Sequence, residues 1–128
     1  YGSVPVKAAP KSVAFVESFT KKYGEERARK MIDHGVGASY DAVYMVAAAI
    51  ERAGSLDPDA VSSALQQTDM EGTIGKIKFG NDHQAIYALD PKEGAIGGAF
   101  QWKAPGVRVP VYPPSVAEGQ IELPSYMK

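Results

Sequence analysis

The chain of 128 residues contains no cysteine. Disulfide bonds, thiolate metal sites and cysteine nucleophiles are therefore excluded. Long apolar runs are missing as well, since the longest one, Ala42–Ile50, includes Tyr44 and is followed by Glu51-Arg52. That run is much shorter than the roughly twenty apolar residues that a membrane-spanning helix needs.

An excess of positive charge is also missing. Lys and Arg number 14 and Asp and Glu number 15, which leaves a net charge of −1. The basic residues gather only in the short groups Lys21-Lys22 and Arg27–Lys30. A nucleic-acid partner is therefore not expected, because a surface that follows phosphates needs a larger basic patch.

The sequence lacks the usual motifs of catalysis and metal binding. Its two histidines, His34 and His83, lie far apart, and neither has a second ligand at the spacing of a metal site. No serine stands in a G-x-S-x-G context, and the glycines of residues 93–98 lack the lysine and the helix of a phosphate-binding loop. We expect neither an enzyme nor a bound metal or cofactor.

What is present is the composition of a globular protein, with 45% hydrophobic and 23% charged residues. Four segments have the apolar spacing of helices, namely residues 11–23, 25–34, 39–53 and 58–67. Ser39 and Asp57 stand where N-caps are expected, and Gly24 and Gly54 where helices end. The third segment is small and apolar almost all round, which predicts a helix buried against a sheet.

Beyond Gly72 the apolar residues alternate, as they do in strands. We predict a strand over residues 72–79 with a return strand over 85–89, and a second hairpin made of 99–103 and 107–112 around Pro105-Gly106. The glycine-rich residues 90–98 predict irregular structure, and the proline-rich residues 113–128 predict an extended tail.

One ordered set of motifs resembles a known family. The set is G-A-S-Y-D-A-V at 37–43, A-I-E-R-A-G-S-L-D at 49–57, A-V-S-S-A-L at 60–65, G-T-I-G-K-I-K-F at 72–79 and Q-W-K at 101–103. It is similar to the closing third of a type I periplasmic substrate-binding protein of an ABC transporter, the family of the leucine/isoleucine/valine-binding proteins. The resemblance covers about residues 1–124.

This resemblance implies an α/β fold class: the C-terminal part of a two-lobed fold, with helices packed on a mostly parallel sheet and a C-terminal β-hairpin. Residues 1–92 would belong to one lobe and residues 99–128 to the other, ending in an extended tail. Residues 93–98 would form the crossing between lobes. The glycines Gly94, Gly97 and Gly98 would act as a hinge there, or would simply form a loop.

The resemblance also implies a ligand site at the start of the third helix, because in the family this loop points into the cleft between the lobes. The residues are Val36, Gly37, Ala38, Ser39 and Tyr40. Free backbone N–H groups at a helix start suit a carboxylate. The alternative is that the loop only makes a turn and caps the helix. Trp102 would line a cleft or pack in the core.

The implied function is the capture of a small carboxylate-bearing solute, an amino acid or an aromatic or other small organic acid, and its delivery to a membrane permease. Expected partners are this ligand, the ABC permease, and the remainder of the same binding protein or a second copy. The expected location is the periplasm, or the cell exterior on a membrane anchor in a Gram-positive host. Two alternatives are a ligand-sensing domain of a receptor or regulator and a small stand-alone interaction domain.

Overall fold

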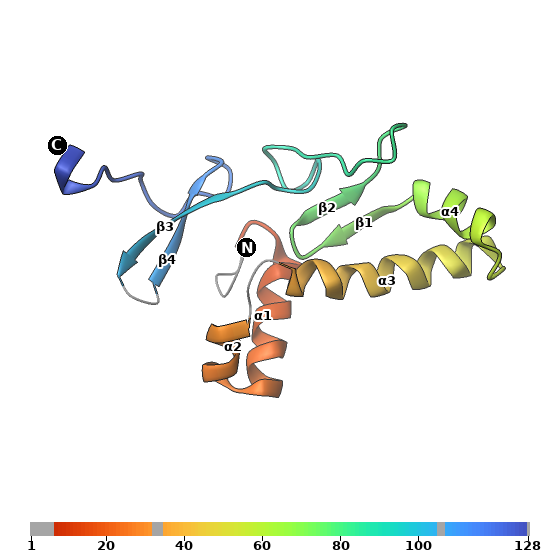
Figure 1. Ribbon diagram of the computed structural model, residues 1–128, viewed down its shortest axis with the longest axis horizontal. Helices are drawn as coiled ribbons and strands as arrows, with labels where there is room; N and C mark the ends of the chain where they lie inside the picture. Colours follow the sequence, from red (N-terminus) through yellow and green to blue (C-terminus); the bar gives the residue numbers. More distant parts are fainter. Residues whose placement is uncertain (1–6, 32–34, 105–106, 128) are drawn as a thin grey trace.

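The computed structural model describes residues 7–31, 35–104 and 107–127 (Figure 1). Residues 1–6, His34 and the turn predicted at Pro105-Gly106 lie outside these ranges. The elements are α1 (Pro10–Tyr23), α2 (Glu25–Met31), α3 (Val36–Ala53), α4 (Pro58–Gln66), β1 (Asp69–Gly72), β2 (Gly75–Lys78), β3 (Ala99–Ala104), β4 (Val107–Tyr112) and a 3₁₀ turn (Ser125–Met127).

The four predicted helices are all present, and their end signals explain most of their bounds. The side chain of Asp57 caps α4 by accepting a hydrogen bond from the Ala60 N–H at 3.0 Å. Gly54 ends α3 in the left-handed conformation, with φ 60° and ψ 20°. The predicted cap at Ser39 is wrong, because α3 already begins at Val36 and the cap position belongs to Gly35.

Both sheets among the described residues are two-stranded and antiparallel. These residues therefore contain no part of the parallel sheet of the expected fold. The predicted strand over 72–79 is split, since the turn after Gly72 separates β1 from β2 and pairs Gly72 with Gly75. The predicted return strand over 85–89 is reduced to two isolated bridges, an antiparallel one between Phe79 and Ala85 and a parallel one between Tyr87 and Ala95. The hairpin of β3 and β4 is as predicted.

The molecule is open (Figure 1). Helices α1 and α2 form one arm of the molecule, and α3 and α4 extend from it in another direction. A long extended segment leads from these helices to the β3–β4 hairpin. The accessible surface is 8365 Å², whereas a compact monomer of this mass exposes about 6,600 Å². The one cluster of buried apolar side chains among the described residues joins Ala9, Ile96 and Val116.

Helix α3 differs from the prediction that it is buried all round. Ala49 is fully buried, but Val43 is 69% exposed and Val46 is 41% exposed. With Ala42, Ala47 and Ile50, these valines form an apolar strip that we call the bare face of α3. A strip of this kind is covered in most folded proteins, because water contact with apolar side chains is unfavourable.

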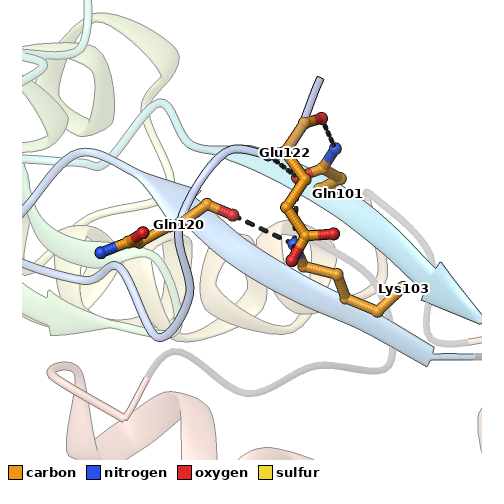
Figure 2. A network of polar contacts seen from close by, with 4 residues as sticks. All are labelled: Gln101, Lys103, Gln120 and Glu122. Carbon is orange, nitrogen blue, oxygen red and sulfur yellow. Dashed lines mark hydrogen bonds and ion pairs between the residues drawn. The ribbon is translucent and has the colours of Figure 1, made fainter. Parts of the chain in front are cut away.

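Residues 120–122 of the tail lie along β3 (Figure 2). The Gln101 side chain donates to the carbonyl of Glu122 at 2.6 Å and accepts from its N–H at 2.9 Å. The Lys103 ammonium donates to the carbonyl of Gln120 at 3.0 Å and pairs with the Glu122 carboxylate at 2.9 Å. These contacts fix the extended residues 120–122 to the hairpin.

Candidate functional site

The five residues predicted to contact ligand form the beginning of α3: Val36, Gly37, Ala38, Ser39 and Tyr40. Ser39 is exposed. The helix begins without a side-chain cap, because a glycine precedes it. The first N–H groups of a helix have no acceptor inside it and lie at the positive end of its dipole. The start of α3 therefore presents backbone donors that suit a negatively charged group.

These residues divide between two neighbours of the helix. Val36 and Tyr40 face α1 and line a groove beside it. Ala38 lines a small cavity of about 100 Å³ on the side of β2 and the loop after it. Gly37 lies against Thr73, and a Cβ at position 37 would stand 2.6 Å from the threonine hydroxyl oxygen. Only glycine permits this approach without a shift of its neighbour.

Asp41 is buried just beyond this first part of α3, with 1% of its surface exposed. Its Oδ2 accepts hydrogen bonds from the backbone N–H and the hydroxyl of Thr73, at 2.6 and 2.7 Å. A Cβ on Gly72 would lie 2.9 Å from the same oxygen. Hydrogen bonds to a carboxylate are strong, so this side chain fastens the start of α3 to the turn between β1 and β2.

Lys11 of α1 completes the polar cluster. Its Nζ lies 3.6 Å from Asp41 Oδ1 and donates to a backbone carbonyl of β1 at 2.9 Å. The same ammonium lies over the rings of Tyr40 and Tyr44, 5.9 and 5.4 Å from their centroids. We call Lys11, Asp41 and Thr73 the clamp, because they join α1, α3 and the β1–β2 hairpin at one point.

A groove of about 380 Å³ runs between α1 and the start of α3. Its aromatic lining consists of Phe15, Phe19, Tyr23 and Tyr40. The ring centroids of Tyr23 and Phe19, Phe19 and Phe15, and Phe15 and Tyr40 are 4.6, 5.9 and 4.9 Å apart. Among the described residues of its lining, Lys11 and Lys22 are charged and none is acidic. We call this the aromatic groove.

The hydroxyl of Tyr40 is protonated at neutral pH. A side-chain hydrogen bond with Tyr44 raises the pKa of Tyr40 above its ordinary value, and burial and the charge of Asp41 act in the same direction. A neutral phenol can donate a hydrogen bond as well as accept one. Tyr40 therefore offers both a ring face and a polar group at the edge of the aromatic groove.

The three glycines predicted at the crossing have different surroundings. Gly94 is buried, and a Cβ there would lie 2.7 Å from a backbone oxygen. The N–H of Ile96 donates to the carbonyl of Ile74 at 2.8 Å, which ties this part of the segment to the β1–β2 hairpin. Gly97 and Gly98 follow and are exposed. Backbone contacts to the β1–β2 hairpin therefore hold this segment as far as Ile96.

Trp102 lies away from the start of α3, on β3. It is 62% exposed, so the alternative that placed it in the core is wrong for this chain. The guanidinium group of Arg108 stacks over its ring at 5.2 Å from the centroid, which covers part of the indole face.

Sequence reasoning missed the clamp. With Ser39 as the expected cap, Asp41 would lie in the first turn of the helix, but α3 begins five residues before Asp41 and the carboxylate is buried. The available signal was a lone acidic residue beside the apolar residues Ala42 and Val43, a position where an acidic side chain needs a polar partner.

Among residues 7–31, 35–104 and 107–127, no group of three or more His, Asp or Glu side chains could hold a metal ion. In the same residues, no helix has the length and apolar character needed to cross a membrane.

Comparisons with known proteins agree on one kind of relative. A family model described as periplasmic binding protein matches residues 3–90. The crystal structure of a candidate branched-chain amino acid ABC transporter from Silicibacter pomeroyi matches with a TM-score of 0.71 and 22% sequence identity. The match covers 90% of this chain, which spans 31% of the length of that protein. No curated protein sequence matches the chain.

Proposed function

The chain belongs to the periplasmic binding protein family, and we propose on that premise that it is the C-terminal part of a solute-binding protein that serves an ABC importer. The family match and the structural likeness confirm the resemblance and the α/β fold class predicted from the sequence. Members of this family are binding proteins of transporters and not enzymes, which agrees with the motifs that the sequence lacks.

The ligand is a small carboxylate-bearing solute, an amino acid or another small organic acid. The observation that carries this proposal is the uncapped start of α3, where the N–H groups of Val36, Gly37 and Ala38 precede the first helical hydrogen bond and Val36 and Tyr40 line an adjoining groove. A carboxylate is the common organic group that such donors and a positive dipole end stabilise. The clamp supports the proposal, because it holds this helix start against the β1–β2 turn.

The chain contributes to two lobes. Residues 1–92 form part of the first, residues 99–128 form part of the second, and the crossing lies between them. Among its glycines, Gly97 and Gly98 supply the hinge, because they are exposed and follow the last backbone contact to the first lobe at Ile96. The backbone of Gly94 is packed too closely to rotate freely, and its lack of a side chain allows the loop to pack at this distance.

The rest of the same binding protein covers the bare face of α3. The excess of accessible surface over that of a compact monomer supports this, as does the exposure of Val43 and Val46. The assembled protein works outside the cytoplasmic membrane, in the periplasm or attached to the outer face of the membrane, and delivers its solute to a permease.

A matched pair of helix-start variants tests the ligand site. Ala38 and Ala60 are both the third residue of a helix, in α3 and α4, and Asp57 already caps α4. Leucine keeps the helix propensity at both positions. In the complete protein, we expect Ala38→Leu to weaken solute binding at least about tenfold, or about 1.4 kcal/mol, and Ala60→Leu to leave it unchanged.

Calorimetric titration with a panel of amino acids and organic acids measures both variants and the parent protein. Binding that is equally tight in Ala38→Leu would show that the start of α3 is only a turn. The absence of saturable binding to any small acid would overturn the proposed function itself.

A further inference from the structure

We propose that the aromatic groove binds the ring of a small aromatic carboxylate and that Lys22 pairs with the carboxylate in addition to the backbone N–H groups at the start of α3. The inference rests on the proposed function and names the ligand class of that site, because Val36 and Tyr40 belong both to the predicted ligand loop and to the groove. It uses a feature that the sequence did not show, the side-by-side placement of α1 and the start of α3.

The aromatic groove has the volume and lining of a site for a small flat molecule. A volume of about 380 Å³ lies in the range of small-molecule sites. Phe15 and Phe19 are half-buried and their rings continue into those of Tyr40 and Tyr23. Rows of ring faces and edges favour a flat aromatic guest over a branched aliphatic one, because aromatic pairs gain stability beyond the area they bury.

The described lining of the groove carries positive charge. It holds two lysines and no carboxylate among the residues that the structure describes, so it attracts an anion. The two lysines differ in their partners. The ammonium of Lys11 is taken up by Asp41 and a backbone carbonyl in the clamp. Lys22 lies over the Tyr23 ring at 5.4 Å and forms no ion pair with any described residue. It is therefore the cation available to a ligand carboxylate.

The aromatic lining and the charge of Lys22 together define the kind of ligand that fits the groove. An aliphatic acid would pair with Lys22 but would not match the aromatic lining. A neutral aromatic compound would fit the rings but would leave the lysine without a partner in the groove. A small molecule with a ring at one end and a carboxylate at the other satisfies both parts of the site.

Three probes separate the contributions of ring and charge: cinnamate, its saturated analogue 3-cyclohexylpropionate, and the neutral cinnamyl alcohol. Titrated into the complete protein, cinnamate should bind most tightly. Each of the other two should bind about tenfold more weakly, because each lacks one of the two favourable interactions. Ring protons of bound cinnamate should also shift upfield in NMR spectra, since they lie over aromatic faces.

Adjacent lysines of α1 provide a matched pair of variants. Lys22 lines the groove and Lys21 does not, although both are in the last turn of the helix. We expect Lys22→Gln to weaken cinnamate binding about tenfold and to have no effect on cinnamyl alcohol. Lys21→Gln should change neither affinity, which controls for the loss of one positive charge from the helix.

The outcomes distinguish this inference from the function on which it rests. Equal affinity for cinnamate and 3-cyclohexylpropionate, or equal effects of the two lysine variants, would overturn the aromatic-carboxylate site. If leucine binds tightly and Ala38→Leu weakens that binding while cinnamate does not bind, the proposed function stands and this inference fails. If no small acid binds, both fail.

Discussion

The two faces of α3 have opposite character. On one face the carboxylate of Asp41 is 1% exposed, while on the other Val43, an apolar side chain, is 69% exposed. This reverses the usual arrangement, in which charges lie in water and apolar side chains lie inside. Within the chain, Oδ2 of Asp41 accepts two hydrogen bonds from Thr73, and Oδ1 lies 3.6 Å from the Lys11 ammonium without accepting a hydrogen bond from any described residue. The exposed side chain of Val43 lies on the bare face. One face of α3, which we call the completed face, packs within this chain, whereas the bare face requires a further surface to cover it.

The largest effect is expected from breaking the completed face. Asp41→Ala leaves the N–H and hydroxyl of Thr73 and the ammonium of Lys11 without their buried partner. We expect a loss of about 3 kcal/mol in the free energy of unfolding. Denaturant unfolding followed by circular dichroism measures it.

Asp41→Asn is the control for shape. The amide oxygen can still accept from Thr73, while the attraction to Lys11 is lost, so a loss of about 1 kcal/mol is expected. A loss in Asp41→Ala that is no greater than in Asp41→Asn would mean that the hydrogen bonds to Thr73 contribute little.

An intermediate effect is expected from added bulk on the two faces. Ala49 is fully buried on the completed face and Ala47 lies on the bare face, two residues apart on one helix. Ala49→Leu should lower the free energy of unfolding by about 2 kcal/mol, because an already filled site must expand. Ala47→Leu should change it by less than about 0.5 kcal/mol in the isolated chain. Thermal unfolding of the two variants measures both changes. Equal losses in the free energy of unfolding would contradict the difference between the two faces.

Much of the fold was predictable because its signals are local. The cap at Asp57, the proline at the start of α4 and the glycine at the end of α3 each act on the next few residues, and those helices end as expected. The β3–β4 hairpin follows from alternation over adjacent residues. The start of α3 was misplaced because Ser39 resembles a cap, whereas Gly35 makes the turn into the helix.

The rest depended on contacts between distant residues. The clamp joins Lys11, Asp41 and Thr73, and the aromatic groove joins α1 with the start of α3. No spacing within one segment reveals such pairs. The exposure of Val43 was unpredictable for a different reason, since an apolar pattern shows that a face is suited to burial but not which segment covers it.

The central claim is that the bare face of α3 is an interface with the rest of a two-lobed binding protein. The absence of cysteine allows single thiols to be placed at Val46 on the bare face and at Ala49 on the completed face, and their rates of alkylation to be compared. In the isolated chain, the thiol of Val46→Cys should react quickly and that of Ala49→Cys slowly. In the complete protein, the account predicts that both react slowly. A Val46→Cys thiol that reacts as fast in the complete protein as in the isolated chain would contradict it.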